Sequence, residues 1–230
     1  MQIGIEASRA NRPVKTGVEW YAYRLIQALK ELPEVAAHTW KLYANETLRD
    51  GLEVGPPNWQ QVPLPWPPKY LWTQGRLSWE MLRHAPDVLF VPAHVLPRVL
   101  PKKTVVTVHD VGFYRYPKLY KPIQNIYHRW STKDILKRAD TVITVSEYSR
   151  QELIHFCDAD PDKVHVTHLG LNQQQYKQMP PEKAALALAR FHLASPFFLY
   201  IGRLEAKKNI LLLIEAFHRY KTDHGLGDPY

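Results

Sequence analysis

Cysteine is nearly absent from this sequence: Cys157 is the one thiol in 230 residues. A single thiol excludes an internal disulfide and a cysteine zinc cluster, and it fits a reducing compartment such as the cytoplasm. Cys157 ends an apolar helical run with Leu153, Ile154 and Phe156. We therefore expect its side chain to be packed in a core rather than to take part in catalysis.

Long hydrophobic runs are also missing. No window approaches about eighteen consecutive apolar residues, so the sequence predicts no membrane-spanning helix. Residues Met1–Ala7 have no basic start and no long apolar centre. They are predicted to form a first β-strand rather than a signal peptide.

The sequence lacks metal-binding and hydrolase signatures as well. Its eleven histidines include no His-Glu-x-x-His run, and no Gly-x-Ser-x-Gly nucleophile elbow occurs. Asp158 and Asp160 have the spacing of a divalent-metal pair, but Pro161 follows them, and the stretch is typical of a turn. The sequence therefore predicts no metal site.

Positive charge is in excess, with a formal net charge of +8. Such an excess indicates attraction to polyanions, anionic lipid or acidic substrates. Residues 113–138 hold seven Lys and Arg residues against one acid, Asp134, and six aromatic side chains lie among them. This basic aromatic segment has two interpretations, a surface for an anionic membrane or a solvated face above core aromatics.

Short apolar runs alternate with helical patterns as far as Gly170. Nearly continuous apolar strands are typical of a parallel sheet with helices on both faces, so we predict an α/β, Rossmann-like doubly wound domain. Ser146 is predicted to cap a helix that runs to about Cys157. The predicted strands are Gln2–Ala7, Thr39–Ala44, Val88–Val91, Thr104–Val108, Thr141–Val145, Val164–His168 and Phe197–Ile201.

A change of pattern after Gly170 divides the chain. We predict a first domain over residues 1–172, a connection over 173–195 and the start of a second domain over 196–230. One strand and one helix are too few to bury a core of their own. The second domain is therefore expected to be incomplete, and the chain to be part of a longer protein.

The most informative segment is Tyr200–Asn209, which reads Tyr-Ile-Gly-Arg-Leu-Glu-Ala-Lys-Lys-Asn between an apolar run and an amphipathic run. A helix start exposes unpaired N–H groups and a positive dipole end, so it attracts anions. Arg203 and Lys208 add two positive charges just after Gly202. The pattern predicts a site for a doubly charged diphosphate.

This segment resembles the donor-diphosphate loop of the retaining glycosyltransferases of family 4, whose GT-B fold has two facing Rossmann-like domains. The resemblance implies that Gly202, Arg203 and Lys208 bind the diphosphate of a sugar nucleotide, and that both cations act in catalysis. It also implies that residues 1–172 form the acceptor-side domain. Most of the nucleotide pocket would then lie outside this chain, and we expect the chain alone to be inactive.

Gly17 lies in the loop Pro13–Tyr21, between a predicted strand and a predicted helix. A glycine lets the backbone approach a ligand closely, and the helix start again favours an anion, although an ordinary turn glycine is the alternative. The resemblance extends to this loop and implies that Gly17 contacts the donor or the acceptor.

His109 and Asp110 end the strand-like run Val106–Val111. An imidazole beside a carboxylate can bind, orient or exchange protons, while the alternative is a structural histidine with a capping aspartate. The continuation Val111–Pro117 resembles the family's His-Asp segment. It implies that His109 lies beside the reacting carbon of the donor sugar and that Asp110 supports it.

The run Val142–Arg150 is the last loop that resembles the family. Helix capping is a sufficient role for Ser146, and Ser149 is expected to bond backbone in the first helical turn. Arg150 is a candidate for binding an anionic acceptor.

Taken in order, the four loops imply a metal-independent, retaining glycosyltransferase. The resemblance implies a GDP-sugar, mannose first, or a UDP-sugar as donor, no further cofactor, and a carbohydrate or lipid-linked acceptor in polysaccharide or glycolipid synthesis. It implies a cytoplasmic enzyme, peripheral at the inner face of the cell membrane. The alternatives left open are a basic nucleic-acid-binding protein, a sugar-binding non-enzyme, and a sugar-nucleotide epimerase or phosphorylase on a similar fold; no nucleic-acid motif is recognised.

Overall fold

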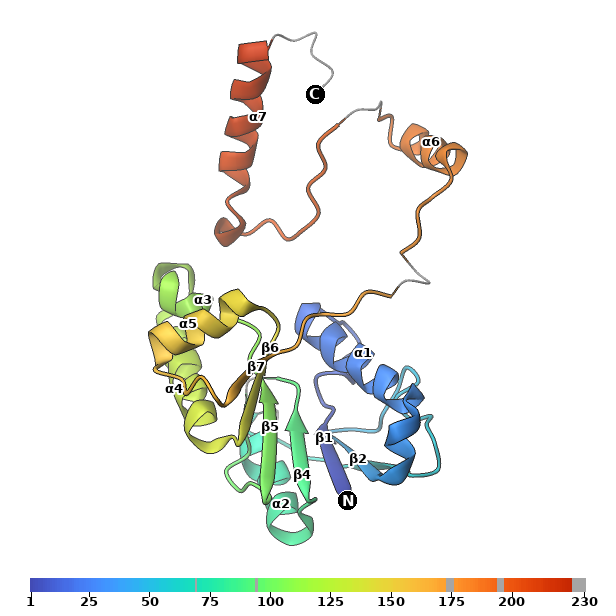
Figure 1. Ribbon diagram of the computed structural model, residues 1–230, viewed down its shortest axis with the longest axis vertical. Helices are drawn as coiled ribbons and strands as arrows, with labels where there is room; N and C mark the ends of the chain where they lie inside the picture. The colour runs from blue at the N-terminus through green and yellow to red at the C-terminus, as the bar shows by residue number, and fades with distance from the viewer. Residues whose placement is uncertain (69, 94, 173–175, 194–196, 225–230) are drawn as a thin grey trace. The chain divides into compact units, whose positions relative to one another are not determined.

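The computed structural model describes residues 1–68, 70–93, 95–172, 176–193 and 197–224. The chain forms two compact units, Met1–Leu169 and Gly170–Tyr230, and each is described by itself. The first unit contains all of the sheet that the described residues form (Figure 1).

The sheet of the first unit has seven strands in the order β3-β2-β1-β4-β5-β6-β7, and every neighbouring pair is parallel. The strands are β1 Gln2–Glu6, β2 Thr39–Ala44, β3 Trp59–Pro63, β4 Val88–Val91, β5 Lys103–Thr107, β6 Thr141–Thr144 and β7 Val164–Val166. The predicted α/β, doubly wound class is confirmed.

Helices cover both faces of this sheet, as expected for parallel strands joined by crossovers. They are α1 Gly17–Glu31, α2 Ser78–His84, α3 Gly112–Arg115, α4 Pro122–Arg138 and α5 Glu147–Cys157, with short helical turns η1 Pro33–Ala37, η2 Thr73–Leu77 and η3 Pro117–Leu119. On one face, Ala22 and Ile26 of α1 pack with Ile5 and Leu42. On the other face, α2, α4 and α5 enclose a second core, which includes Met81, Leu89, Val106, Ile135 and Leu153.

The edge strand β3 was not among the predicted strands. It pairs with β2, and the indole of Trp59 stacks on that of Trp40 with ring centroids 4.8 Å apart and planes 5° apart. Gln60 and Gln61 are exposed, so the apolar signal of this strand is reduced to Trp59 and Val62. Successive residues of a strand point to opposite faces, so exposure of both glutamines means that both faces of this edge strand reach solvent, which weakens its pattern.

The second unit contains α6 Pro181–Arg190, η4 Ala206–Lys208 and α7 Ile210–His224. The predicted strand Phe197–Ile201 was wrong, because these residues form no strand in the structure. A strand needs a neighbour to pair its backbone groups, and no other described segment of this unit supplies one. That residues 196–230 begin a nucleotide-sugar-binding domain stays a prediction.

Among the helices that the structure describes, none is both long enough and apolar enough to cross a membrane.

Candidate active site

The loops singled out in the first unit lie at one edge of the sheet. Because the strands are parallel, their carboxyl ends meet there, and the strand order changes direction between β1 and β4. In open α/β sheets, ligands bind in the crevice outside such a switch point. The loops after β1, β5 and β6 bring Gly17, His109 and Ser149 to this edge.

The imidazole of His109 is held between two other elements at the switch point. Its Nε2 lies 3.1 Å from the carbonyl oxygen of Pro92, the residue after β4. Its ring packs edge-on against Tyr21 of α1, with ring centroids 4.7 Å apart and planes 89° apart. The Tyr21 hydroxyl in turn lies 3.2 Å from Oγ1 of Thr107. The loop that follows β5 therefore meets α1 through these rings.

This environment favours the neutral form of His109. A carbonyl oxygen only accepts, so Nε2 carries the proton that the Pro92 oxygen receives. Burial lowers the pKa of His109, although the bond to Pro92 and the charges of Asp110 and Glu19 act in the opposite direction. In the neutral ring Nδ1 is an acceptor, suited to a hydroxyl group.

The backbone at His109 is fixed from the neighbouring loop. Ser146 caps α5, as predicted, by accepting a 3.1 Å hydrogen bond from the backbone N–H of Ser149. The buried Ser149 hydroxyl donates to the carbonyl oxygen of His109 at 3.1 Å. This bond between the loops after β5 and β6 was not predicted, because Ser149 was expected to bond within its own helical turn.

Asp110 is exposed, and its Oδ1 accepts a 3.1 Å hydrogen bond from the backbone N–H of Gly112 at the start of α3. The carboxylate thus fixes the turn into α3 and places a negative charge beside His109. Its supporting role for a bound donor stays a prediction.

Gly17 is the first residue of α1 and is exposed. A side-chain carbon added at this position would have no atom within 4 Å, and its φ is not in the left-handed region. Neither packing nor backbone conformation therefore requires a glycine here. Close approach of a ligand to the backbone would explain why position 17 is a glycine.

The start of α1 already carries an internal anion, which corrects the expectation of an open anion site there. The Glu19 carboxylate accepts from the backbone N–H of Thr16 at 3.1 Å and lies 3.3 Å from Arg9 and 3.7 Å from Arg12. Burial acts to raise the pKa of Glu19, but the hydrogen bonds from Thr16 and the charge of Arg9 outweigh it and lower that pKa.

Arg9 and Arg12 are functional candidates that lie outside the motifs described for the sequence. Their side chains are 39% and 55% exposed, and the one carboxylate of Glu19 faces both of them. The sequence signal for them is a pair of arginines three residues apart, just after the first strand. They leave positive charge at the carboxyl edge for an anionic ligand.

The carboxylates near this edge are engaged in local structure. Glu6, at the end of β1, is buried and accepts a 2.9 Å hydrogen bond from the backbone N–H of Ser8, and burial raises its pKa. Glu19 caps α1 and Asp110 fixes the turn into α3. Each of these three carboxylates is held by hydrogen bonds within the local structure, so none is placed as a nucleophile.

Arg150 is occupied by local contacts. Its Nε donates to the carbonyl oxygen of Val164 at 3.0 Å, and its Nη2 donates to that of Pro161 at 3.1 Å. Its Nη1 lies 3.3 Å from Glu147. These bonds connect α5 to the approach to β7, which favours a structural role over binding of an acceptor.

Arg203 and Lys208 belong to the second unit. Arg203 is 69% exposed and pairs with Glu205 at 3.0 Å, and its carbonyl oxygen accepts from the Tyr200 hydroxyl at 3.3 Å. Lys208 ends η4, directly before Asn209 (φ 49°) and the start of α7. Both cations therefore precede the amino end of a helix, the setting that favours a diphosphate.

Gly202 lies between Tyr200 and Arg203 in a tight bend. A side-chain carbon at this position would lie 2.5 Å from the hydroxyl oxygen of Tyr200 and 2.9 Å from the ring carbon that bears it. A larger residue here would displace the end of the Tyr200 side chain, whose hydroxyl bonds the carbonyl oxygen of Arg203. Donor binding by Gly202, Arg203 and Lys208 stays a prediction.

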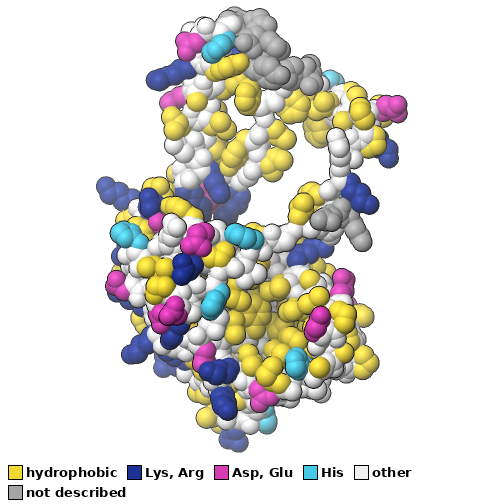
Figure 2. Space-filling view, viewed as in Figure 1, with side chains coloured by type: hydrophobic (Ala, Val, Ile, Leu, Met, Phe, Trp, Pro, Cys, Tyr) yellow, Lys and Arg dark blue, Asp and Glu magenta, His cyan; other side chains and the backbone are white. Residues whose placement is uncertain are grey.

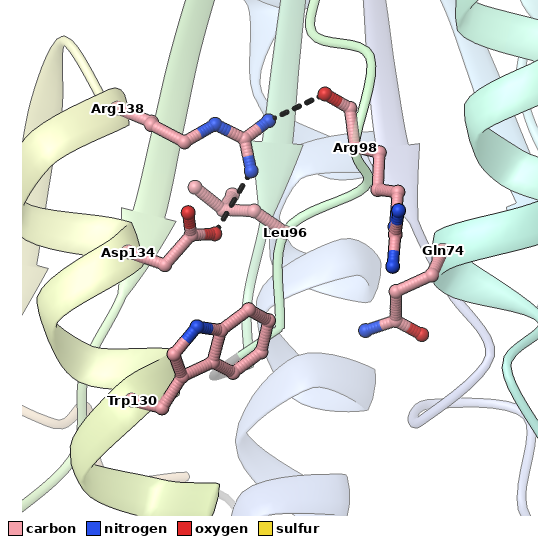
Figure 3. Close-up of a pocket in the computed structure, with 6 residues that line it drawn as sticks. All are labelled: Gln74, Leu96, Arg98, Trp130, Asp134 and Arg138. Carbon is pink, nitrogen blue, oxygen red and sulfur yellow. Dashed lines mark hydrogen bonds and ion pairs between the residues drawn. The ribbon is translucent and has the colours of Figure 1, made fainter.

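A pocket of about 350 Å³ lies elsewhere on the first unit, between α4 and the loop after β4 (Figure 3). Within it, Arg138 pairs with Asp134 at 2.8 Å and donates to the carbonyl oxygens of Pro97 and Arg98. None of the predicted site residues lines this pocket. We place the candidate active site at the carboxyl edge, because the chemistry-bearing loops converge there.

The predicted turn at Asp158 and Asp160 is seen. Asp158 has φ 53° and caps the end of α5, and Asp160 accepts a 3.0 Å hydrogen bond from the backbone N–H of Asp162. Across the described ranges, no group of three or more His, Cys, Asp or Glu side chains is arranged to hold a metal ion.

Comparison with known proteins finds glycosyltransferases. The model of Glycosyltransferase Family 4 matches residues 15–175. The O-antigen chain mannosyltransferase B of Escherichia coli is 28% identical over 143 residues, which cover 62% of this chain and 37% of that protein. The O-antigen chain mannosyltransferase RfbU of Salmonella typhimurium is 26% identical over 117 residues, covering 51% of this chain and 29% of that protein. The chain therefore spans well under half the length of these relatives.

Solved structures share the fold at low sequence identity. Sucrose-phosphate synthase from Thermosynechococcus elongatus superposes with a TM-score of 0.63 at 16% identity, covering 95% of this chain and 60% of that one. HepE of Anabaena, solved in complex with UDP-glucose, gives a TM-score of 0.52 at 17% identity and covers 86% of this chain and 51% of that one.

Proposed function

Because the chain belongs to glycosyltransferase family 4, we propose that it carries part of an enzyme that transfers a sugar from a nucleotide-diphosphate donor to an acceptor hydroxyl. The observation that carries the proposal is the position of His109. Its neutral ring is held at the switch point of the sheet by Pro92 and Tyr21, where a donor sugar would bind.

The main chemical requirement is stabilisation of the leaving group. When the bond between the anomeric carbon and the diphosphate breaks, its electron pair stays on the diphosphate oxygen. Arg203 and Lys208, ahead of the amino end of α7, would neutralise that charge without a metal ion. Donor binding would draw Arg203 away from Glu205, its partner in the structure.

The proposed reaction retains the anomeric configuration. The acceptor oxygen forms its bond to the anomeric carbon on the face from which the diphosphate departs, and its proton passes to the departing phosphate oxygen. The engagement of Glu6, Glu19 and Asp110 in local structure supports a route without a carboxylate nucleophile. The role of His109 is to accept a hydrogen bond from the donor sugar through Nδ1 and to hold the reacting carbon.

The two mannosyltransferases among the relatives favour GDP-mannose as the donor, with UDP-sugars next. Their printed role in O-antigen chains favours an acceptor in polysaccharide synthesis, either a growing glycan or a lipid-linked sugar. The proposed location is the cytoplasm, at the inner face of the cell membrane.

The test uses the full-length protein with GDP-mannose and with UDP-glucose. We expect release of the nucleoside diphosphate, a product with retained anomeric configuration by NMR, and unchanged turnover in EDTA. The chain of residues 1–230 alone should release none. Failure to bind either sugar nucleotide would contradict the proposal, and an inverted product or a loss of turnover in EDTA would contradict the proposed mechanism.

A further inference from the structure

Helix α4 has one buried face and exposes apolar side chains on the opposite face. Its buried residues are Asn125, Ser131, Thr132 and Ile135. Its outer face holds four large apolar residues at positions i, i+3, i+4 and i+7, which lie on one side of a helix. These residues form what we call the outer stripe: Ile123 (84% exposed), Ile126 (68%), Tyr127 (43%) and Trp130 (55%).

The turn before α4 extends the outer stripe. Tyr116 and Leu119, on either side of Pro117, are also exposed. The aromatic residues of the basic aromatic segment thus divide into two groups. Phe113 is buried in the core, whereas Tyr116 and the outer stripe face solvent. The interpretation that core aromatics lie beneath a solvated face therefore accounts for only part of this segment, because the outer stripe, Tyr116 and Leu119 are large apolar side chains exposed to solvent.

Four exposed lysines surround the outer stripe. They are Lys118, Lys121, Lys133 and Lys137, and none has a carboxylate within ion-pair distance among the described residues. In contrast, Arg115 is bound by Glu152 at 2.6 Å and Arg138 by Asp134 at 2.8 Å. In Figure 2, Lys and Arg side chains gather along the border of the first unit formed by α3, α4 and α5, with apolar side chains among them.

The lysines also have an order along the helix. Lys133 and Lys137 follow Trp130 by three and seven positions, so they continue the same side of α4 beyond the outer stripe. The exposed side is therefore apolar and aromatic in the first half of the helix and cationic in the second. Arg98, which lines the pocket beside Trp130, adds another exposed positive charge (Figure 3).

From this arrangement we infer that α4 and the turn before it attach the protein to the surface of an anionic lipid bilayer. Isoleucine, tryptophan and tyrosine side chains enter the boundary between head groups and acyl chains, while lysines remain among the phosphates. Each lysine near an anionic bilayer contributes to attraction that salt weakens. A nucleic acid would use the lysines but would gain little from two exposed isoleucines, so charge and apolar surface together favour lipid.

The position of this surface gives it a consequence for the active site. His109 and Asp110 lead through α3 directly into the turn before α4, so the outer stripe begins near the carboxyl edge of the sheet (Figure 1). On the basis of the proposed function, a bilayer bound to the outer stripe would present a lipid-linked acceptor at the edge where His109 lies.

Flotation of the protein with vesicles tests the inference directly. Phosphatidylcholine vesicles with increasing phosphatidylglycerol content should bind the chain with increasing affinity. The double variant Ile123→Ser with Ile126→Ser should lower that affinity by about tenfold or more. The double variant Lys118→Glu with Lys121→Glu should lower it by at least about fivefold for each charge removed. Glutamates near the amino end of α4 suit its dipole, so this variant should remain folded.

Two matched variants serve as controls. Leu32→Ser removes an exposed apolar side chain that follows α1, and Lys102→Glu reverses an exposed charge before β5. Both should float like the unchanged protein.

Several results would overturn the inference: no binding, equal binding to vesicles without phosphatidylglycerol, or equal loss in the outer-stripe and control variants. If the outer-stripe variants instead change the molar mass measured by light scattering, the surface is a protein interface and the inference is wrong. Flotation needs neither donor nor turnover. A full-length protein that floats but transfers no sugar would refute the proposed function and leave the inference of a lipid-binding surface intact.

Discussion

Ser149 donates a 3.1 Å hydrogen bond to the carbonyl oxygen of His109 and so ties the first turn of α5 to the loop after β5. We expect Ser149→Ala to lower the free energy of unfolding by about 1–2 kcal/mol, because its hydroxyl group loses the hydrogen bond to His109 and the one from the Ser146 hydroxyl. Since His109 would lose a fixed backbone position, turnover should fall by roughly tenfold to a hundredfold. Denaturant unfolding and steady-state kinetics of the full-length protein measure the two effects.

Ser146→Ala is the control for this prediction. It removes the cap of α5, which also costs about 1 kcal/mol, but it leaves the bond from Ser149 to His109 in place. Turnover should therefore change little. Equal losses of turnover in both variants would show that general destabilisation, rather than the position of His109, accounts for the effect.

Protonation of His109 should destabilise the fold. Burial lowers the pKa of His109 below its ordinary value of 6.5, so the unfolded chain takes up this proton more readily than the folded protein. The stability that depends on neutral His109 is therefore fully present above pH 6.5 and is lost as the pH falls through the lowered pKa. Comparing urea unfolding of the unchanged protein and of His109→Gln at several pH values measures this difference.

The variant should lack this part of the acid-induced loss, and the pKa of His128, which burial also lowers, affects both proteins alike. Turnover of the unchanged protein should decrease over the same pH range, because protonated Nδ1 no longer accepts a hydrogen bond. A parallel pH dependence of stability in the two proteins would contradict the burial of His109.

Arg203→Ala should lower kcat/KM for the sugar nucleotide by at least about tenfold in the full-length protein, since a charge-assisted hydrogen bond contributes about 1.5–3 kcal/mol. Lys207→Ala is the matched control, because Lys207 also pairs with Glu205 but is not one of the proposed diphosphate ligands. Near-normal kinetics of Arg203→Ala, or an equal loss in Lys207→Ala, would refute the diphosphate role.

Gly17→Ala tests whether a glycine at this position is needed for ligand binding or for folding. The added methyl group meets no atom within 4 Å, so stability should stay within about 1 kcal/mol of the unchanged protein. Affinity for the donor or the acceptor should nevertheless decrease if the backbone of Gly17 contacts it.

Gly4→Ala should instead affect folding. Its added carbon would lie 2.6 Å from the Tyr43 ring and 2.9 Å from Pro86, so the variant should destabilise the fold by about 1–3 kcal/mol.

Much of the first unit could be predicted from the sequence because its strands are short apolar runs with helices between them. The cap at Ser146 and the meeting of the Gly17 and His109 loops at one edge followed from residue type and from the geometry of parallel strands. These features depend on local pattern and on one topological rule.

The features that were missed depend on long-range contacts. β3 is stabilised by pairing with β2 and by the stacking of Trp59 on Trp40, which no local pattern reveals. Phe197–Ile201 has the pattern of a strand but no described neighbour to pair with. The occupation of the α1 start by Glu19 is an exception, because Thr16 and Glu19 have the Thr-x-x-Glu spacing of a capping box, which is a local signal. The sequence pattern identifies candidate strands, and pairing with distant segments determines which of them form.

The internal position of β1 in the sheet has a consequence for folding. β1 lies between β2 and β4, and its residue Ile3 pairs with Val88, far along the chain. One side of β1 therefore stays unpaired until this distant partner is in place. Since non-local parallel pairing is slow, we expect sluggish refolding in vitro and a need for chaperones during rapid expression.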